Sequence, residues 1–206
     1  MEVVTAAELA GVVTFAISGV LAVSVRLDWF GVVVVGIVTA LGGGTIRDVI
    51  LDDTPVVWVE DLGYLAAAAA GAALATPLAR WLATGSRRRF EEALQVADAA
   101  GLALFVVVGA QIALDVGFGA GVAIVSAVVT GIGGGLIRDV LAARTPMVLA
   151  GEFYATAALG GAIVYVTLDR AASVPELPAA VAGALTVFVL RVLGIRRRWT
   201  VPAITR

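Results

Sequence analysis

The chain has 206 residues, of which 61% are hydrophobic and 15% are charged, with a net charge of −2. Soluble domains are about half apolar and a quarter charged, so this composition indicates an integral membrane protein and excludes the basic surface of a nucleic-acid binder. The sequence contains no Cys and no His, which excludes disulfides and catalysis by a thiolate or an imidazole.

A transmembrane helix needs about 20 mostly apolar residues. The first candidate is interpreted as a retained span, because Glu2 and Glu8 stand where a signal peptide would need basic residues. The last candidate is expected to form the shortest helix. Seven spans are predicted, near residues 7–25, 30–51, 62–83, 93–114, 118–141, 152–169 and 177–194.

One phrase occurs twice in the chain. Residues 39–55 read TALGGGTIRDVILDDTP, and residues 130–146 read TGIGGGLIRDVLAARTP. The two copies are 91 residues apart, and a shift of 91 residues also overlays the first three spans on the next three. This predicts repeats at 7–83 and 98–169 and an extra helix at 177–194. Because three is an odd number, the second copy enters the membrane from the opposite side. The sequence therefore predicts a single all-α membrane domain over 1–206 with an inverted 3+3 repeat, an arrangement typical of transport folds. A duplication without a transport role remains the alternative.

Each copy places a glycine triplet near the middle of its span. Glycines allow a helix to kink, and they also let another helix approach closely. A kink would release carbonyl groups that can line a wet cavity or coordinate a cation, whereas close packing would involve no ion at all. We expect kinked helices with the triplets in an ion pathway. The residues are Gly42, Gly43 and Gly44 in the second span and Gly133, Gly134 and Gly135 in the fifth.

An Arg-Asp pair follows each triplet, and charges at this depth are costly and usually functional. Adjacent residues of a helix do not face each other, so each arginine is expected to find its partner at the start of the preceding repeat helix. This reasoning pairs Arg47 with Glu8 and Arg138 with Asp98. The alternative is that both arginines extend to lipid headgroups. The Arg-Asp pairs are Arg47–Asp48 and Arg138–Asp139.

Several uncharged polar side chains also lie within the spans. As a set they are expected to line the pathway near the triplets, although any one of them alone is more typical of a hydrogen bond between helices. These residues are Ser18, Thr39, Gln111, Ser126 and Thr130.

The distribution of arginine predicts the orientation, because basic residues favour the cytoplasmic side. The clusters at 87–89 and 196–198, together with Arg26 and Arg144, fall on one face if the N-terminus is outside. The acidic segment 52–61 then falls on the opposite face. We expect a plasma-membrane protein with a cytoplasmic C-terminus. The run Arg87, Arg88 and Arg89 is also a candidate for binding anionic lipid.

The phrases GGGTIRDVI and GGGLIRDVL resemble those of the prokaryotic trimeric intracellular cation (TRIC) channel family, which is also labelled as a glycine-transporter-like membrane domain. The resemblance extends to TFAISGVLA at 14–22, DAAGLALFVVVGAQIAL at 98–114 and RTPMVL at 144–149. It implies a homotrimer with one pore in each protomer, surrounded by the first, second, fourth and fifth spans. It also implies passage of K⁺, and of Na⁺, without a cofactor or any metal beyond the transient ion.

The segment at 26–29 lacks the Lys-Glu-Val signature of animal members, so their lipid and Ca²⁺ regulation is not implied. A secondary transporter of a small solute such as glycine is the competing function. The channel is favoured because the acids cluster toward the membrane interfaces, while Gly, Ser and Thr occupy the middle. An enzyme is not expected, since the chain offers no nucleophile–base pair or metal cluster.

Overall fold

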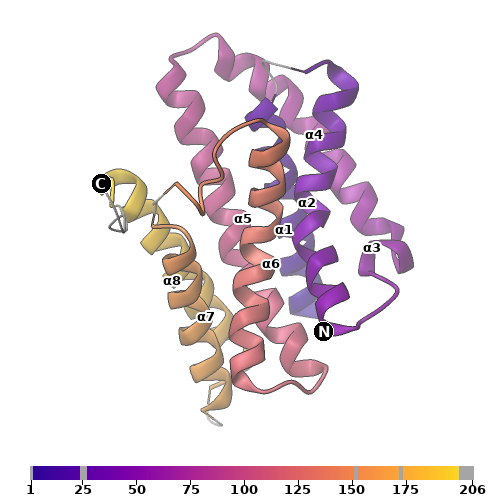
Figure 1. Ribbon diagram of the computed structural model, residues 1–206, viewed down its shortest axis with the longest axis vertical. Coiled ribbons are helices and arrows are strands. Elements are labelled where there is room, and N and C mark those ends of the chain that lie inside the picture. Colours follow the sequence, from indigo (N-terminus) through magenta and orange to yellow (C-terminus); the bar gives the residue numbers. More distant parts are fainter. Residues whose placement is uncertain (1, 24–26, 151–152, 172–173, 200–206) are drawn as a thin grey trace.

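The computed structural model describes residues 2–23, 27–150, 153–171 and 174–199. Within these ranges all regular structure is helical, which confirms the predicted all-α class (Figure 1). The helices are α1 (Glu2–Val23), α2 (Trp29–Leu51), α3 (Val57–Glu60), α4 (Leu62–Ala83), α5 (Arg87–Asp115), α6 (Ala120–Leu141), α7 (Ala155–Arg170) and α8 (Glu176–Arg197).

Six of the described helices have the length and apolar composition to cross a membrane, namely α1, α2, α4, α5, α6 and α8. The shortest of the seven predicted spans is α7, with 16 residues or about 24 Å. The expectation that the last span would be shortest is wrong, because α8 has 22 residues. Helix α7 begins at Ala155, and before it the backbone N–H of Met147 is hydrogen-bonded back to Asp139 of α6. Arg26 and residue 152, which entered the predictions above, lie outside the described residues.

Four helices form the centre of the bundle. Helix α1 contacts α2, α5 and α6, and α2 and α5 each pack along α6. Helix α4 covers α1 and α2, and α7 covers α5 and α6 in the same way, so the third helix of each repeat occupies an equivalent place. Helix α8 has no counterpart in the repeat, and it packs beside α7 and α5 on one side of the bundle (Figure 1).

The two repeats meet at a pair of equivalent aromatic rings. Phe15 of α1 stacks on Phe105 of α5, with ring centroids 5.2 Å apart. Gly11 faces the Phe105 ring, and Gly101 faces the Phe15 ring in return. Because equivalent residues contact each other, a local twofold axis passes between these rings. The observed bundle therefore has the inverted-repeat architecture that the sequence predicts.

Candidate functional site

Helices α2 and α6 come into backbone contact at the two glycine triplets. A Cβ atom on Gly43 would collide with the carbonyl oxygen of Thr130, and a Cβ atom on Gly134 would collide with that of Thr39. We call this contact the glycine crossing. Both helices remain continuous through their triplets. The carbonyl groups expected from a broken helix are therefore not released at the triplets.

The first charged cluster comprises Glu8, Arg47, Asp48 and Tyr64 and joins α1, α2 and α4. Arg47 Nη1 lies 2.8 Å from Glu8 Oε1, which confirms the predicted pair. Arg47 Nε also donates to Asp48 Oδ1 at 2.7 Å. The Tyr64 hydroxyl donates to Glu8 Oε2 at 3.0 Å, and the backbone N–H of Val57 donates to Asp48 Oδ2 at 3.0 Å.

The second charged cluster comprises Asp98, Arg138, Asp139 and Tyr154 and repeats this pattern. Arg138 Nη1 lies 2.5 Å from Asp98 Oδ1, which confirms the other predicted pair. Arg138 Nε donates to Asp139 Oδ1 at 2.9 Å. The Tyr154 hydroxyl donates to Asp98 Oδ1 at 3.2 Å, and the backbone N–H of Met147 donates to Asp139 Oδ2 at 2.9 Å.

The two clusters differ in detail although their plans are the same. In the second, Arg138 Nη1 also donates to Ser18 Oγ of α1 at 2.9 Å, which links the two repeats. Asp98 is shorter than Glu8 by one methylene, and its Oδ2 atom is buried without a hydrogen-bond partner among the described residues. Glu8 accepts through both of its oxygens. The second cluster therefore retains a free acceptor that the first does not have.

Neither arginine reaches toward lipid headgroups. Arg47 is 2% exposed and Arg138 is 0% exposed, so the alternative of snorkelling side chains is wrong. Burial of a charge is costly unless it is paired and hydrogen-bonded, and here each guanidinium is held between two carboxylates. Two acids and one base leave each cluster with one net negative charge.

Each aspartate next to an arginine turns out to be its partner, contrary to the expectation from helix geometry. The reason lies in the chain after each helix. That chain folds back and offers the backbone N–H of Val57 or Met147 to the second carboxylate oxygen. The carboxylate is thereby held against the helix end, within reach of the long arginine side chain.

Three of the five uncharged polar residues contact the clusters or the crossing. Ser18 binds Arg138, and Thr39 and Thr130 each contact the crossing and donate to a carbonyl one turn back. Ser126 donates to the carbonyl of Gly109 and so forms a hydrogen bond between α6 and α5. Gln111 is different, because its side chain donates to Glu176 Oε1 of α8 at 2.7 Å. The structure thus places Gln111 at the contact between α5 and α8 and not with the others.

Sequence reasoning missed the two tyrosines and Arg191. Tyr64 and Tyr154 stand ninety residues apart, as do Glu8 and Asp98. The glycine phrases are 91 residues apart, so an alignment of the repeats that allows a one-residue change of register would have matched Tyr64 with Tyr154 and Glu8 with Asp98. Arg191 lies in α8, outside the repeat, with its Cζ atom 4.7 Å from the centroid of the Tyr154 ring. The repeat therefore carries no signal that could have revealed it.

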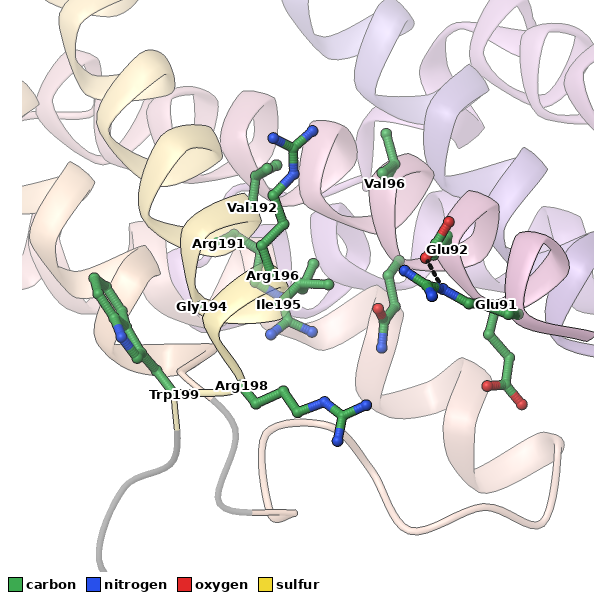
Figure 2. Close-up of a pocket in the computed structure, with 12 residues that line it drawn as sticks. Glu91, Glu92, Val96, Arg191, Val192, Gly194, Ile195, Arg196, Arg198 and Trp199 are labelled. Carbon is green, nitrogen blue, oxygen red and sulfur yellow. Dashed lines mark hydrogen bonds and ion pairs between the residues drawn. The ribbon is translucent and has the colours of Figure 1, made fainter.

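A groove of about 840 Å³ lies between the start of α5 and the end of α8 (Figure 2). Arg191 and Arg196 line it from α8, and Glu91 and Glu92 line it from α5. Of the arginine run at 87–89, only Arg88 contributes to the lining, and it is paired with Glu92 at 2.7 Å. The groove is thus where the arginine run at 87–89 and the arginine run at 196–198 come together.

Inverted repeats, a glycine crossing and two buried charge clusters together define an integral membrane protein with a duplicated helical core. The sequence profile described as "Glycine transporter" matches residues 5–80 and again residues 95–170. The inner membrane protein YadS of Escherichia coli K12 is 44% identical over 95% of this chain and 93% of its own length. A membrane protein of Vibrio cholerae is 42% identical over 95% of this chain and 80% of its own length.

Solved structures show the same relationship. The TRIC trimeric intracellular cation channel orthologue from Rhodobacter sphaeroides has a TM-score of 0.89 and 37% identity, covering 97% of this chain and 100% of that one. A prokaryotic TRIC channel crystallised in 0.5 M KCl has a TM-score of 0.87 and 31% identity, covering 96% of this chain and 98% of that one. The chain belongs to the prokaryotic TRIC channel family.

Proposed function

We propose that this protein is a homotrimeric cation channel of the cell membrane, with one pathway for K⁺ and Na⁺ in each protomer. The observation that carries the proposal is the placement of the two charged clusters on either side of the glycine crossing. Each cluster leaves one net negative charge, and the Thr39 and Thr130 hydroxyls lie beside the crossing. Such a lining attracts cations through fixed charges and dipoles. The solved relatives are described as cation channels.

The glycine crossing is the proposed gate. Gly43 and Gly134 are buried against carbonyl oxygens of the facing helix, so passage of an ion requires α2 and α6 to move apart there. At its centre the crossing is a close contact between small residues, and on either side of it Ile137 of α6 packs over Gly42 and Ile46 of α2 packs over Gly133. Separation of the two helices therefore requires these two isoleucine side chains to move with them.

Transport of glycine is the second candidate, favoured by the description of the family profile that matches the chain. Flux from proteoliposomes distinguishes the two. We expect K⁺ to leave loaded vesicles passively and radiolabelled glycine to be retained, with or without a cation gradient. Vesicles without protein are the control. Glycine uptake that depends on a gradient, in the absence of passive K⁺ flux, would overturn the proposal.

The proposed orientation places the N-terminus outside and the C-terminus in the cytoplasm. Because the chain has no cysteine, single-cysteine variants report sidedness without a background signal. Asp53→Cys in intact cells should react with a membrane-impermeant thiol reagent. Gly85→Cys should react only after the cells are opened. The reverse pattern would contradict the orientation.

We also propose that anionic lipid headgroups bind at the arginine run 87–89. Arg88 is the best placed of the three because it lines the groove between α5 and α8, whereas Arg87 does not line it. Arg88→Gln should weaken retention of phosphatidylglycerol in native mass spectrometry more than Arg87→Gln does. Equal loss in both variants would favour a diffuse surface charge over the groove.

A further inference from the structure

The starting observation is a buried cation on the helix that lies outside the repeat. Arg191 of α8 is 1% exposed and is among the largest fully buried side chains of the protein. A guanidinium at such a site is costly. Helix α8 packs against α5 and α7, both of which belong to the second repeat. The interactions of Arg191 are therefore directed to one half of the pseudo-symmetric core.

Arg191 contacts both residues that hold the acids of the second charged cluster. Its guanidinium lies over the Tyr154 ring, at 4.7 Å from Cζ to the centroid, which is a cation–π distance. Its Nη2 atom lies 3.2 Å from Met147 Sδ. Tyr154 in turn donates to Asp98, and the backbone N–H of Met147 donates to Asp139. One side chain of α8 thus reaches both acids, each through one intermediate residue.

The first charged cluster is built without such a contact from α8. Val57 stands where Met147 stands in the second half, and its N–H makes the equivalent hydrogen bond to Asp48. A valine has no sulfur atom to receive a guanidinium. Met147 Sδ, in contrast, lies near two arginines, because Arg138 Nη2 is 3.8 Å away. Met147 therefore connects the cluster directly to α8.

Arg191 also lines the groove at the C-terminal end of α8. Figure 2 shows Arg191, Arg196 and Arg198 on the α8 side of this groove, facing Glu91 and Glu92 of α5. A movement of α8 that widens or narrows the groove would displace the Arg191 guanidinium. The same movement would then shift Tyr154 and Met147.

We infer that Arg191 is a positioning residue through which α8 holds the second charged cluster, so that α8 controls gating from that half of the pathway alone. The arrangement of the cluster does not depend on whether the protein conducts. The consequence for gating rests on the proposed channel function. One experiment below tests the arrangement of the cluster, and a second tests its consequence for gating.

The first experiment is a pair of double-mutant cycles read by thermal unfolding of the detergent-solubilised protein. Arg191→Gln is combined with Asp139→Asn of the second cluster and, as a matched control, with Asp48→Asn of the first. We expect non-additivity of roughly 2–4 °C for the Asp139 cycle, because residues within one network couple. The Asp48 cycle should be additive. Additivity in both cycles, or equal coupling in both, would overturn the inference even if the channel conducts normally.

The second experiment records single channels in planar bilayers. Arg191→Gln should change the open probability about fivefold, the lower range of coupling between distinct sites. Arg191→Lys, which keeps a cation over the Tyr154 ring, should remain near wild type. Arg197→Gln removes a charge from the same helix outside the groove and should have no effect. An unchanged open probability in Arg191→Gln, or an equal change in Arg197→Gln, would contradict the assigned role.

Met147→Leu keeps the experiment decisive if Arg191→Gln does not assemble. This substitution conserves volume and removes only the sulfur contacts to the two arginines. It should change the open probability in the same direction as Arg191→Gln, and wild-type gating would overturn the inference. If the wild-type protein itself passes no cation current, the proposed function fails. The thermal cycles then still test Arg191.

Discussion

At Gly43 the nearest atom to an added Cβ is the carbonyl oxygen of Thr130, which belongs to the backbone of the facing helix and cannot rotate away. The neighbouring Gly44 differs, since an added Cβ would meet only Arg47 Nη2 at 3.8 Å. Both glycines are buried in α2. Alanine substitutions at these two positions change helix propensity alike, so a difference between them reports the contact at the crossing.

Gly43→Ala should lower the thermal stability of the protein, and Gly44→Ala should not. Overpacking of this kind costs about 1–3 kcal/mol, or roughly 2–12 °C for a chain of this size. Unfolding in detergent, followed by tryptophan fluorescence, measures the difference. Equal stability of the two variants would mean that α2 and α6 do not meet at Gly43.

The pair of Arg138 and Asp98 gives a second prediction at the level of single residues. Removing one partner of a buried ion pair leaves an uncompensated charge and costs about 3–5 kcal/mol, whereas removing both costs less. Arg138→Gln should therefore be more destabilising than the double variant Arg138→Gln with Asp98→Asn. Thermal unfolding of the two variants and the wild type makes the comparison. A double variant as unstable as the sum of its parts would show that the groups act independently.

Between helices, α7 and α8 are held together by another pair of glycines. A Cβ on Gly161 would collide with Val187 Cγ2 and with the carbonyl oxygen of Gly183, whereas a Cβ on Gly160 would meet only the end of the Leu190 side chain at 3.2 Å. Gly161→Ala should thus separate α8 from α7 and lower thermal stability by roughly 2–12 °C. Gly160→Ala should be tolerated, because a leucine side chain can move. Similar unfolding temperatures for the two variants would contradict the contact.

The extents of the helices show which parts of the fold can be predicted from hydropathy. The apolar part of α5 was placed correctly, but the helix begins at Arg87, six residues before the predicted start. Ser86 caps this start, and ion pairs of Arg87 with Glu91 and Arg88 with Glu92 accompany the additional turns. Such charged turns lie outside any apolar window. Helix α7 begins at Ala155, three residues after the predicted start, and Tyr154 immediately before it joins the second charged cluster.

The candidate site could be predicted only where the repeat carried a signal. The pairs of Glu8 with Arg47 and Asp98 with Arg138 followed from depth and symmetry, and both are present. The contacts of Asp48 and Asp139 with their neighbours depend on how the following chain folds back, which periodicity does not describe. Arg191 depends on the packing of a helix that has no equivalent in the repeat. Symmetry thus predicts the shared plan of the site, and the differences between its halves require the structure.

For the whole molecule, the proposed pathway predicts weak discrimination between K⁺ and Na⁺. Two helices that remain continuous where they cross keep their carbonyl groups within the helices, so they do not form a fourfold cage of carbonyls. We expect the permeability ratio to stay within about tenfold, or about 1.4 kcal/mol. Reversal potentials under opposing K⁺ and Na⁺ gradients measure this ratio. A ratio far above tenfold would require a closer coordination shell than this crossing provides.

The net charge of the two clusters leads to the final prediction, on selection of cations over anions. Asp48 and Asp139 each supply the acid that leaves their cluster with one net negative charge, so Asp48→Asn or Asp139→Asn makes that cluster neutral. Each substitution should reduce cation flux and move the reversal potential in a KCl gradient toward zero. Both substitutions should act in the same direction, but not equally, because only the second cluster is also held by Arg191 of α8. Asp53→Asn, an exposed acid near the same end of α2 as Asp48, is the control and should behave as wild type. Unchanged selectivity in both cluster variants would show that cations do not pass near these carboxylates, and the pathway would then have to lie elsewhere in the bundle.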